Sequence, residues 1–166
     1  MSAKELQKPD LMTEEEWAGV LDAVSSLKRI RADGRAHTEL YLSSGEQAYQ
    51  VRIGPPSLLL TTIGRKSGKE ISTPLNFMYD GENYYVVGSL AGYDVHPHWA
   101  LNLEKNPRAW IQVKDKKMAV TARRVVGEER SRLWPRLLTV LPLWGVFQQR
   151  TEREFPVVVL SPQPNK

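Results

Sequence analysis

"LLLTTIGRKSGKEISTPLNFMYDGENYYVVG", residues 58–88, alternates apolar segments with short turns rich in glycine and charge. The segments of strand length, rich in β-branched and aromatic side chains, are residues 58–63, 71–79 and 84–88. The turns between them are Gly64 to Gly68 and Asp80-Gly81. Consecutive hairpins of this kind predict an antiparallel sheet.

The rest of the chain extends this pattern. Further strands are expected at residues 109–113, 118–126 and 157–160, with a turn at 114–117. Helices are expected at residues 98–105, which Asn106-Pro107 end, and at 128–141, which open with an acidic turn. The predicted fold is mainly β with α (α+β): a small closed or split barrel, because closure removes exposed sheet edges.

An amphipathic helix precedes the barrel. Thr13 to Glu16 form a capping-box pattern, and apolar residues then recur at helical spacing from Trp17 to Leu27, up to Gly34. The apolar face is explained either by packing onto the barrel or a partner subunit, or by a membrane surface or a cover over the substrate site. We therefore predict an N-terminal helical appendage at 1–50 and a barrel domain at 51–166.

Composition limits the possible functions. A chain of 166 residues can form one domain that buries about two-thirds of its unfolded surface. The absence of cysteine excludes disulfides, thiolate metal sites and cysteine nucleophiles. A net charge of +4 suggests an anionic ligand or surface partner. Because the N-terminus lacks the apolar core of a secretory signal, the expected location is the cytoplasm.

The turn "GRKSGKE", residues 64–70, is either a solvated hairpin tip or an anion site. Gly64 and Gly68 permit positive φ and a convergent nest of amides. Arg65 offers a planar fork, Lys66 and Lys69 offer point charges, and Ser67 adds a hydroxyl. This combination suits a phosphate, although it is not a Walker A loop.

Two other motifs point away from common chemistries. His96-Pro97-His98 has no third ligand at metal-site spacing, so no metal is predicted. "GSLAG", residues 88–92, has its serine one position too early for a nucleophile elbow, so acyl transfer is not expected.

Two longer blocks carry a family resemblance. Residues 58–92 and "HPHWALNLEKNPRAWIQV", residues 96–113, resemble the deazaflavin-dependent nitroreductase family, whose members use reduced coenzyme F420. The resemblance runs from Ser57 to Pro162. It implies an FMN-binding-protein-like split β-barrel with an N-terminal helix and two short inserted helices. The implied cofactor is coenzyme F420 (8-hydroxy-5-deazaflavin), with FMN as the alternative.

The resemblance also implies a set of cofactor-binding residues. Arg65, Lys66 and Ser67 would hold the phosphate and the acidic tail, assisted at longer range by Lys69. The strand Ile71, Ser72, Thr73, Pro74, Leu75 and Asn76 would lie along the cofactor, with Pro74 at a break or an edge. The remaining contacts would be Val87, Gly88, Ser89, Leu90, His98, Trp99, Ala100, Leu101 and Asn102.

The implied reaction is hydride transfer to an electron-poor acceptor, with the protein aligning the two molecules. Ser89 is the predicted catalytic hydroxyl, although His98 or solvent could also supply the proton, and without the family context Ser89 is a turn residue. Where the nitroreductase branch has acceptor-lining tyrosines, this chain has Leu141, Trp144 and Phe147. These residues are either core or an apolar lid; Trp144 is assigned to catalysis and cofactor contact. Quinones, enones and nitroaromatics are the expected acceptors.

Other hypotheses stay open from the sequence. They are an FMN-binding reductase, a non-catalytic F420 carrier, and an anion- or nucleic-acid-binding module using Arg65, Lys66, Lys69, Arg123 and Arg124. No interleaved basic and aromatic motif supports a nucleic-acid reader, so none is predicted as a partner. The expected partners are a small-molecule acceptor, a membrane surface contacted peripherally through the N-terminal helix, and at most a second copy of the chain, as a monomer or homodimer.

Overall fold

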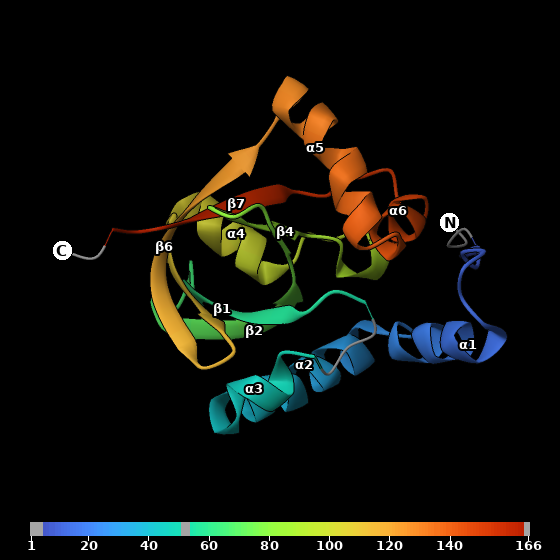
Figure 1. The fold of residues 1–166 in the computed structure, drawn as a ribbon, viewed down its shortest axis with the longest axis horizontal. Coiled ribbons are helices and arrows are strands. Elements are labelled where there is room, and N and C mark those ends of the chain that lie inside the picture. The colour runs from blue at the N-terminus through green and yellow to red at the C-terminus, as the bar shows by residue number, and fades with distance from the viewer. Residues whose placement is uncertain (1–4, 51–53, 165–166) are drawn as a thin grey trace.

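The computed structural model describes residues 5–50 and 54–164, and its centre is one antiparallel sheet of seven strands. The order across the sheet is β2-β1-β5-β6-β7-β4-β3 (Figure 1). The strands are β1 (Ser57–Ile63), β2 (Glu70–Asn76), β3 (Met78–Tyr79), β4 (Tyr84–Val87), β5 (Arg108–Val113), β6 (Lys116–Val125) and β7 (Val157–Pro162). The mixed α and β composition predicted from the sequence is confirmed.

Phe77 joins the two edges of this sheet. β2 ends at Asn76 and β3 begins at Met78, yet β2 and β3 are the two edge strands. The sheet must therefore curl until its edges are one residue apart, which makes it a barrel. The prediction of one strand over 71–79 was wrong, because a single strand cannot belong to both edges. Pro74 lies on the edge strand β2, as predicted, where a missing N–H is tolerated.

The helices agree with the sequence only in part. They are α1 (Glu14–Ala23), α2 (Leu27–Ser43), α3 (Gly45–Ala48), the 3-10 turn η1 (Leu90–Gly92), α4 (His98–Lys105), α5 (Gly127–Val140) and α6 (Leu143–Gln148). α4 has the predicted bounds, and the capping box of Thr13 and Glu16 is present. The single N-terminal helix predicted up to Gly34 was wrong. Ser26 caps a second helix by accepting a hydrogen bond from the Arg29 amide at 3.0 Å.

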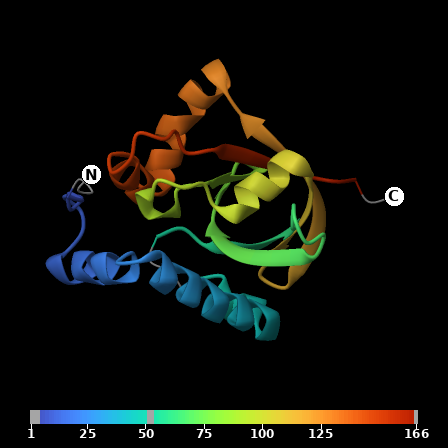
Figure 2. The ribbon, with the colours of Figure 1, turned by 180° about the vertical axis from the view of Figure 1, so that it is seen from behind.

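The helices cover opposite sides of the barrel. α1, α2 and α3 lie along the side of β1 and β2, whereas α5 and α6 lie on the other side (Figures 1 and 2). One core fills the barrel around Leu60, Val86 and Ile111, and another lies under α5 and α6 around Leu137 and Phe155. In the described part of the chain, no helix is both long and apolar enough to cross a membrane.

Most of the apolar face of α1 points into the protein, with Leu21, 42% exposed, as the exception. Trp17 is buried, and Val20 and Val24 pack against the core under α5 and α6. The Tyr93 hydroxyl also donates a hydrogen bond to the Val24 carbonyl, at 2.8 Å. These contacts favour packing as the reason for the amphipathic pattern of α1.

Buried polar contacts fix α2 and α3 to the barrel. The Tyr41 hydroxyl donates to the Ser57 carbonyl at 2.5 Å, and His37 Nε2 lies 2.8 Å from the Ala48 carbonyl. Gly45 touches the β5–β6 turn so closely that an added Cβ would lie 1.9 Å from the Lys114 carbonyl oxygen. The helices α2 and α3 thus share contacts with the barrel, and the domain boundary at residue 50 stays a prediction.

Gly45→Ala should lower the free energy of unfolding by about 1–3 kcal/mol, because the methyl group overlaps backbone that cannot move aside easily. The matched control is Gly34→Ala within α2, where nothing lies within 4 Å of an added Cβ. That variant should be neutral or stabilising by up to about 1 kcal/mol, the helical advantage of alanine. Urea titrations measure both, and equal effects would contradict the close docking of α3.

Candidate functional site

The basic hairpin between β1 and β2 is anchored on α4. Asn102 is 1% exposed, and its Oδ1 accepts hydrogen bonds from the backbone amide of Arg65 at 3.1 Å and from Arg65 Nη1 at 3.0 Å. Asn102 Nδ2 donates to the Thr62 hydroxyl at 3.1 Å. One buried amide therefore fixes the start of the hairpin loop and the direction of its first cation.

Hydrogen bonds inside the loop fix its remaining backbone. The Gly64 amide donates to the Lys69 carbonyl and the Gly68 amide to the Gly64 carbonyl, each at 2.8 Å. The Lys69 amide donates to the Ser67 hydroxyl at 3.2 Å. The amides of Gly64, Arg65, Gly68 and Lys69 are thus already bonded, contrary to the nest expected from the sequence. The side-chain cations, the Ser67 hydroxyl and the amides of Lys66 and Ser67 are the groups that remain for an anion.

These cations form a cluster without internal compensation. Arg65 Nη2 donates to His98 Nδ1 at 3.4 Å, and Lys105 Nζ donates to the Arg65 carbonyl at 3.4 Å. Lys66 and Lys69 are exposed. Among the described residues, no carboxylate lies within ion-pair distance of Arg65, Lys66, Lys69 or Lys105. The arrangement fits a phosphate and an acidic tail.

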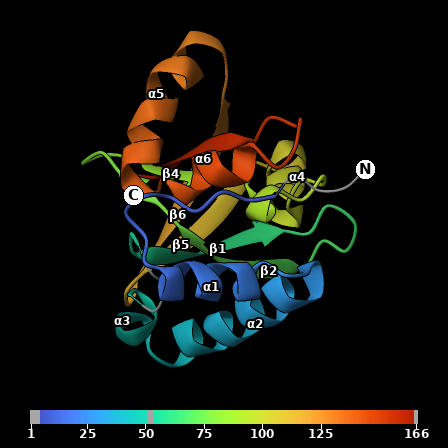
Figure 3. The same ribbon diagram turned by 90° about the vertical axis from the view of Figure 1, so that its right-hand side faces the viewer.

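The cation cluster affects the pKa of His98. His98 is exposed, but partial desolvation by its neighbours lowers the pKa of its imidazole, and the positive charges of Arg65, Arg31 and Lys66 lower that pKa further. Arg31 belongs to the first turns of α2, at the end of that helix nearer the β1–β2 hairpin (Figure 3). Sequence reasoning missed Arg31 because it is one cation among several on an exposed helix. Only the packing of α2 beside β2 brings it near the site.

Strand β2 presents part of its predicted cofactor face. Ile71 is 44% exposed. The Ser72 hydroxyl shares a 2.7 Å hydrogen bond with that of Thr61 on β1. At the far end of β2, Asn76 Nδ2 donates to the Pro55 carbonyl at 2.8 Å, while its Oδ1 bonds no described residue. Thr73, Leu75 and Asn76 are half-buried, whereas Pro74 is buried.

The two other predicted blocks divide into reachable and buried residues. Ser89 and Leu90 are half-exposed, and the Ser89 hydroxyl bonds no other described residue, so it is available to a ligand. His98 is exposed and Leu101 half-buried. The buried members are Val87, Gly88, Trp99, Ala100 and Asn102. Of these, Asn102 acts on the site through Arg65, and Trp99 packs in the barrel core.

Trp144 lies in the core rather than at the surface. It is 4% exposed, and its neighbours Leu141 and Phe147 are 9% and 8% exposed. All three belong to the cluster under α5 and α6. This burial favours core packing, one of the two readings left open by the sequence, over an apolar lid; a direct role for Trp144 stays a prediction.

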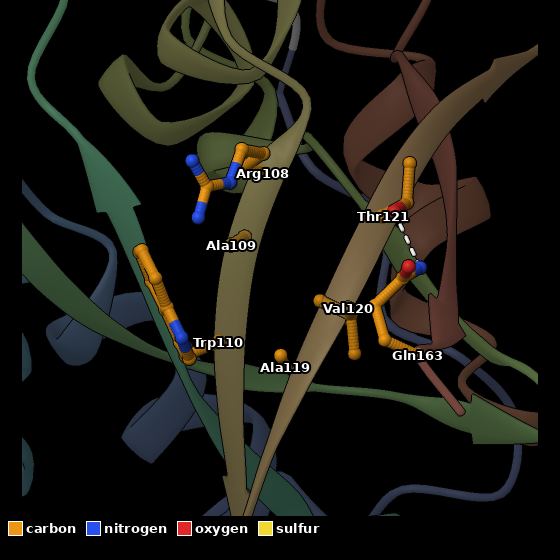
Figure 4. Close-up of a pocket in the computed structure, with 7 residues that line it drawn as sticks. All are labelled: Arg108, Ala109, Trp110, Ala119, Val120, Thr121 and Gln163. Carbon is orange, nitrogen blue, oxygen red and sulfur yellow. Dashed lines mark hydrogen bonds between the residues drawn. The ribbon is translucent and has the colours of Figure 1, made fainter. Parts of the chain in front are cut away.

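Two hollows offer space for a small molecule. One, of about 290 Å³, is formed by the paired strands β5 and β6 with Gln163; its lining residues are Arg108, Ala109, Trp110, Ala119, Val120, Thr121 and Gln163 (Figure 4). It contains no predicted site residue. The other, of about 420 Å³, is lined by Tyr49, Pro55, Pro56, Phe77, Met78, Tyr79, Tyr84, Val113 and Val140. We call the second the aromatic hollow; it begins beside Asn76, because Pro55 and Phe77 line it.

The geometry gives little support to metal binding or nucleic-acid binding. His96 Nδ1 lies 3.2 Å from Arg153 Nη1, so both histidines of the His96-Pro97-His98 motif face guanidinium groups. Within residues 5–50 and 54–164, no three potential ligands are grouped to hold a metal ion. Arg123 pairs with Glu129 at 3.0 Å and Arg124 with Glu104 at 3.3 Å. These two cations are therefore compensated within the protein, which weakens the nucleic-acid hypothesis.

Comparison with known proteins gives consistent results. Residues 33–162 match a family described as F420H(2)-dependent quinone reductase. The chain is 35% identical to the F420H(2)-dependent quinone reductase Rv1261c of Mycobacterium tuberculosis, over 76% of this chain and 88% of that protein. A solved F420-H2 dependent reductase, FDR-A, is 36% identical with a TM-score of 0.59, over 64% of this chain and 94% of that one. A structure described as a domain-swapped dimer is 33% identical with a TM-score of 0.61, over 76% and 96%. The predicted split barrel is confirmed.

The cation cluster predicts how His98 titrates. The pKa of His98 in the folded protein lies below 6.5, so the unfolded chain binds a proton at this imidazole more readily than the folded protein does. The stability contributed by neutral His98 is therefore lost as pH falls below about 6.5. Lys66→Ala should raise the pKa of His98 by removing a positive charge, whereas Lys117→Ala, a change at an exposed residue of β6, should not. NMR titration of the imidazole signals measures both. No difference between the variants would contradict the cluster.

Proposed function

Because the chain belongs to the F420H(2)-dependent quinone reductase family, we propose that it transfers a hydride from reduced coenzyme F420 to a quinone. The chain is an F420H(2)-dependent reductase, and FMN, the alternative cofactor, finds no support in its relatives. The observation that carries the proposal is the uncompensated cation cluster at the β1–β2 hairpin. A protein that binds a phosphodiester with an acidic tail needs such a cluster.

We infer a division of labour within the cluster. Arg65 is oriented by Asn102 and His98, so its guanidinium meets a phosphate without first losing much conformational freedom. Lys66 and Lys69 are exposed point charges suited to the mobile acidic tail. Ser67 has its hydroxyl engaged as an acceptor by the Lys69 amide, which leaves the hydroxyl proton for an anion. Arg31 and Lys105 add attraction from the two neighbouring helices.

The coenzyme, when bound, supplies the hydride, so the protein has to orient it, exclude water and provide a proton. The residues along the ring would be those of β2 from Ile71 to Asn76 and the loop from Val87 to Leu90. The Ser89 hydroxyl is unengaged within the described chain and half-exposed, which suits a proton donor. His98 is the other candidate: its Nδ1 accepts from Arg65, which keeps the proton of the neutral ring on Nε2.

The acceptor fits the aromatic hollow best. Its rings are grouped: Tyr79 and Tyr84 are stacked at 4.6 Å between ring centroids, and Phe77 lies 5.5 Å from Tyr84. Such walls favour a planar, apolar molecule, and the tyrosine hydroxyls can donate to carbonyl oxygens. The phenols absent near Trp144 thus have counterparts beside Asn76. These features favour quinones over enones and nitroaromatics, which stay secondary predictions.

Assembly and location are further predictions. A homodimer is suggested by the relative described as a domain-swapped dimer. Size-exclusion chromatography with light scattering distinguishes it from a monomer. Peripheral membrane contact through α1 would have to rely on Leu21, which is 42% exposed, because Trp17 is buried and Val20 is packed against the core. The cytoplasm stays the expected location, and a peripheral membrane contact stays a prediction.

Arg65→Ala and Lys66→Ala should each weaken F420 binding by about 1–3 kcal/mol, the effect of losing a charge-assisted hydrogen bond. Quenching of coenzyme fluorescence measures the affinity, with Lys117→Ala as the charge-matched control. Unchanged affinity in the double variant would refute the hairpin as the anion site. Oxidation of reduced F420 by a quinone tests the reaction itself; binding without turnover would favour a carrier.

Val140→Phe should raise the KM for quinone by roughly tenfold while the affinity for F420 changes little, because the larger side chain fills the aromatic hollow. The control is Ala119→Phe, which fills the hollow formed by β5, β6 and Gln163. Steady-state kinetics at saturating reduced F420 distinguish the two. A rise in KM with Ala119→Phe alone would assign the acceptor to the other hollow.

A further inference from the structure

The loop after β4 has an unusual backbone. Leu90, Ala91 and Gly92 have φ angles of 41°, 53° and 81°, so three consecutive residues are left-handed. Leucine and alanine adopt this region at a cost in free energy, and such strain persists only where surrounding contacts impose it. Gly92 also needs to lack a side chain, because an added Cβ would lie 2.4 Å from the Phe147 carbonyl oxygen.

One side chain imposes much of this conformation. Arg153 donates to three carbonyls of the loop: Nη1 to Gly88 at 3.0 Å, Nη2 to Ser89 at 2.7 Å and Nε to Tyr93 at 2.7 Å. Its Nη1 also lies 3.2 Å from His96 Nδ1. All three nitrogens of the guanidinium are therefore engaged with the segment from residue 88 to residue 96.

Arg153 is held in place from its own side. Its guanidinium carbon lies 4.7 Å from the centre of the Phe155 ring, and its carbonyl accepts from Gln148 Nε2 at 2.7 Å. In the described part of the chain no carboxylate forms an ion pair with it, and burial lowers its pKa, while the charge of Asp94 opposes that shift. A half-buried cation whose partners are mainly carbonyls serves geometry rather than charge pairing.

The neighbouring residues reinforce the same clamp. Arg150 Nη1 donates to the Ala91 carbonyl at 3.3 Å, and its guanidinium lies over the Tyr93 ring at 4.4 Å. The Thr151 hydroxyl donates to the Asp94 carboxylate. The segment between α6 and β7 thus grips the loop after β4 at several points, although about 60 residues separate them in sequence.

We propose that Arg153 is a positioning residue of the coenzyme site, which clamps the carbonyl oxygens of Gly88, Ser89 and Tyr93 and so holds Ser89 and Leu90 ready for the deazaflavin ring. This role rests on the proposed function. The arrangement of Ser89 supports it: its carbonyl is fixed by Arg153, whereas its hydroxyl bonds no other described residue. The backbone is thus determined by the protein, and the functional group is left for a ligand.

The test is Arg153→Lys, which keeps the charge but cannot bond three carbonyls from one planar group. Hydrogen exchange of the amides of residues 90–93 in the ligand-free protein should accelerate at least about tenfold. With reduced F420 and quinone, kcat should fall by roughly tenfold to a hundredfold, as expected when a reacting group is misplaced by about 1 Å. F420 affinity should fall less than about tenfold, because the hairpin cations are untouched.

The matched control is Arg130→Lys. Arg130 is also half-buried, donates to the Phe155 carbonyl at 3.0 Å and stacks 4.8 Å from the Trp134 ring centre, but it does not touch the loop. In Arg130→Lys, the rate of hydrogen exchange at the amides of residues 90–93 and the kcat should stay within about twofold of the wild type. Equal losses in both variants, or a lower melting temperature in Arg153→Lys with unchanged exchange and kcat, would overturn the proposal.

The exchange measurement needs no coenzyme, so it separates this proposal from the proposed function. If the wild-type protein neither binds F420 nor oxidises its reduced form, the proposed function fails, and with it the role of the clamp at a coenzyme site. If the wild type turns over but Arg153→Lys exchanges and reacts like it, only the positioning role fails. Rescue of the exchange rate by guanidinium ion in Arg153→Gly would support it further.

Discussion

The single-residue connection at Phe77 is the constraint on which the rest of the structure depends. Because β2 and β3 are opposite edges of the sheet, the chain can pass from Asn76 to Met78 only if the sheet curls on itself. Phe77 is 6% exposed in the barrel core and also lines the aromatic hollow. Closure of the barrel and formation of the hollow beside Asn76 therefore have one structural cause.

The two loops of the proposed site are attached to this barrel by buried or half-buried polar side chains. Asn102 on α4 fixes the basic hairpin, and Arg153 fixes the loop that carries Ser89. In both cases one planar side chain bonds several groups of a loop whose sequence alone would leave it flexible. The entropy cost of ordering these two loops is thus met when the chain folds and not when a ligand binds, which is the advantage of a preorganised site.

The electrostatics follow the same logic. Cations near the hairpin lack carboxylate partners, whereas Arg123 and Arg124 on β6 are paired with Glu129 and Glu104. The positive charge of the hairpin is therefore left for a ligand, whereas that of Arg123 and Arg124 is compensated within the protein. Such a cluster suits an anionic ligand, in agreement with the proposal that the hairpin holds the phosphate and the acidic tail of the coenzyme.

The sequence by itself determined the strands of the barrel, helix α4, the basic hairpin and the family, because hydrophobic periodicity, turn residues and local motifs act over a few residues. It did not predict the strand break at Phe77 or the burial of Trp144. Nor did it predict that Arg31 lies near the hairpin or that Arg153 bonds the loop after β4. Those features depend on which edges meet and which side chains lie side by side after the chain has closed. Contacts across about 60 residues leave no local pattern, so only the tertiary structure decided them.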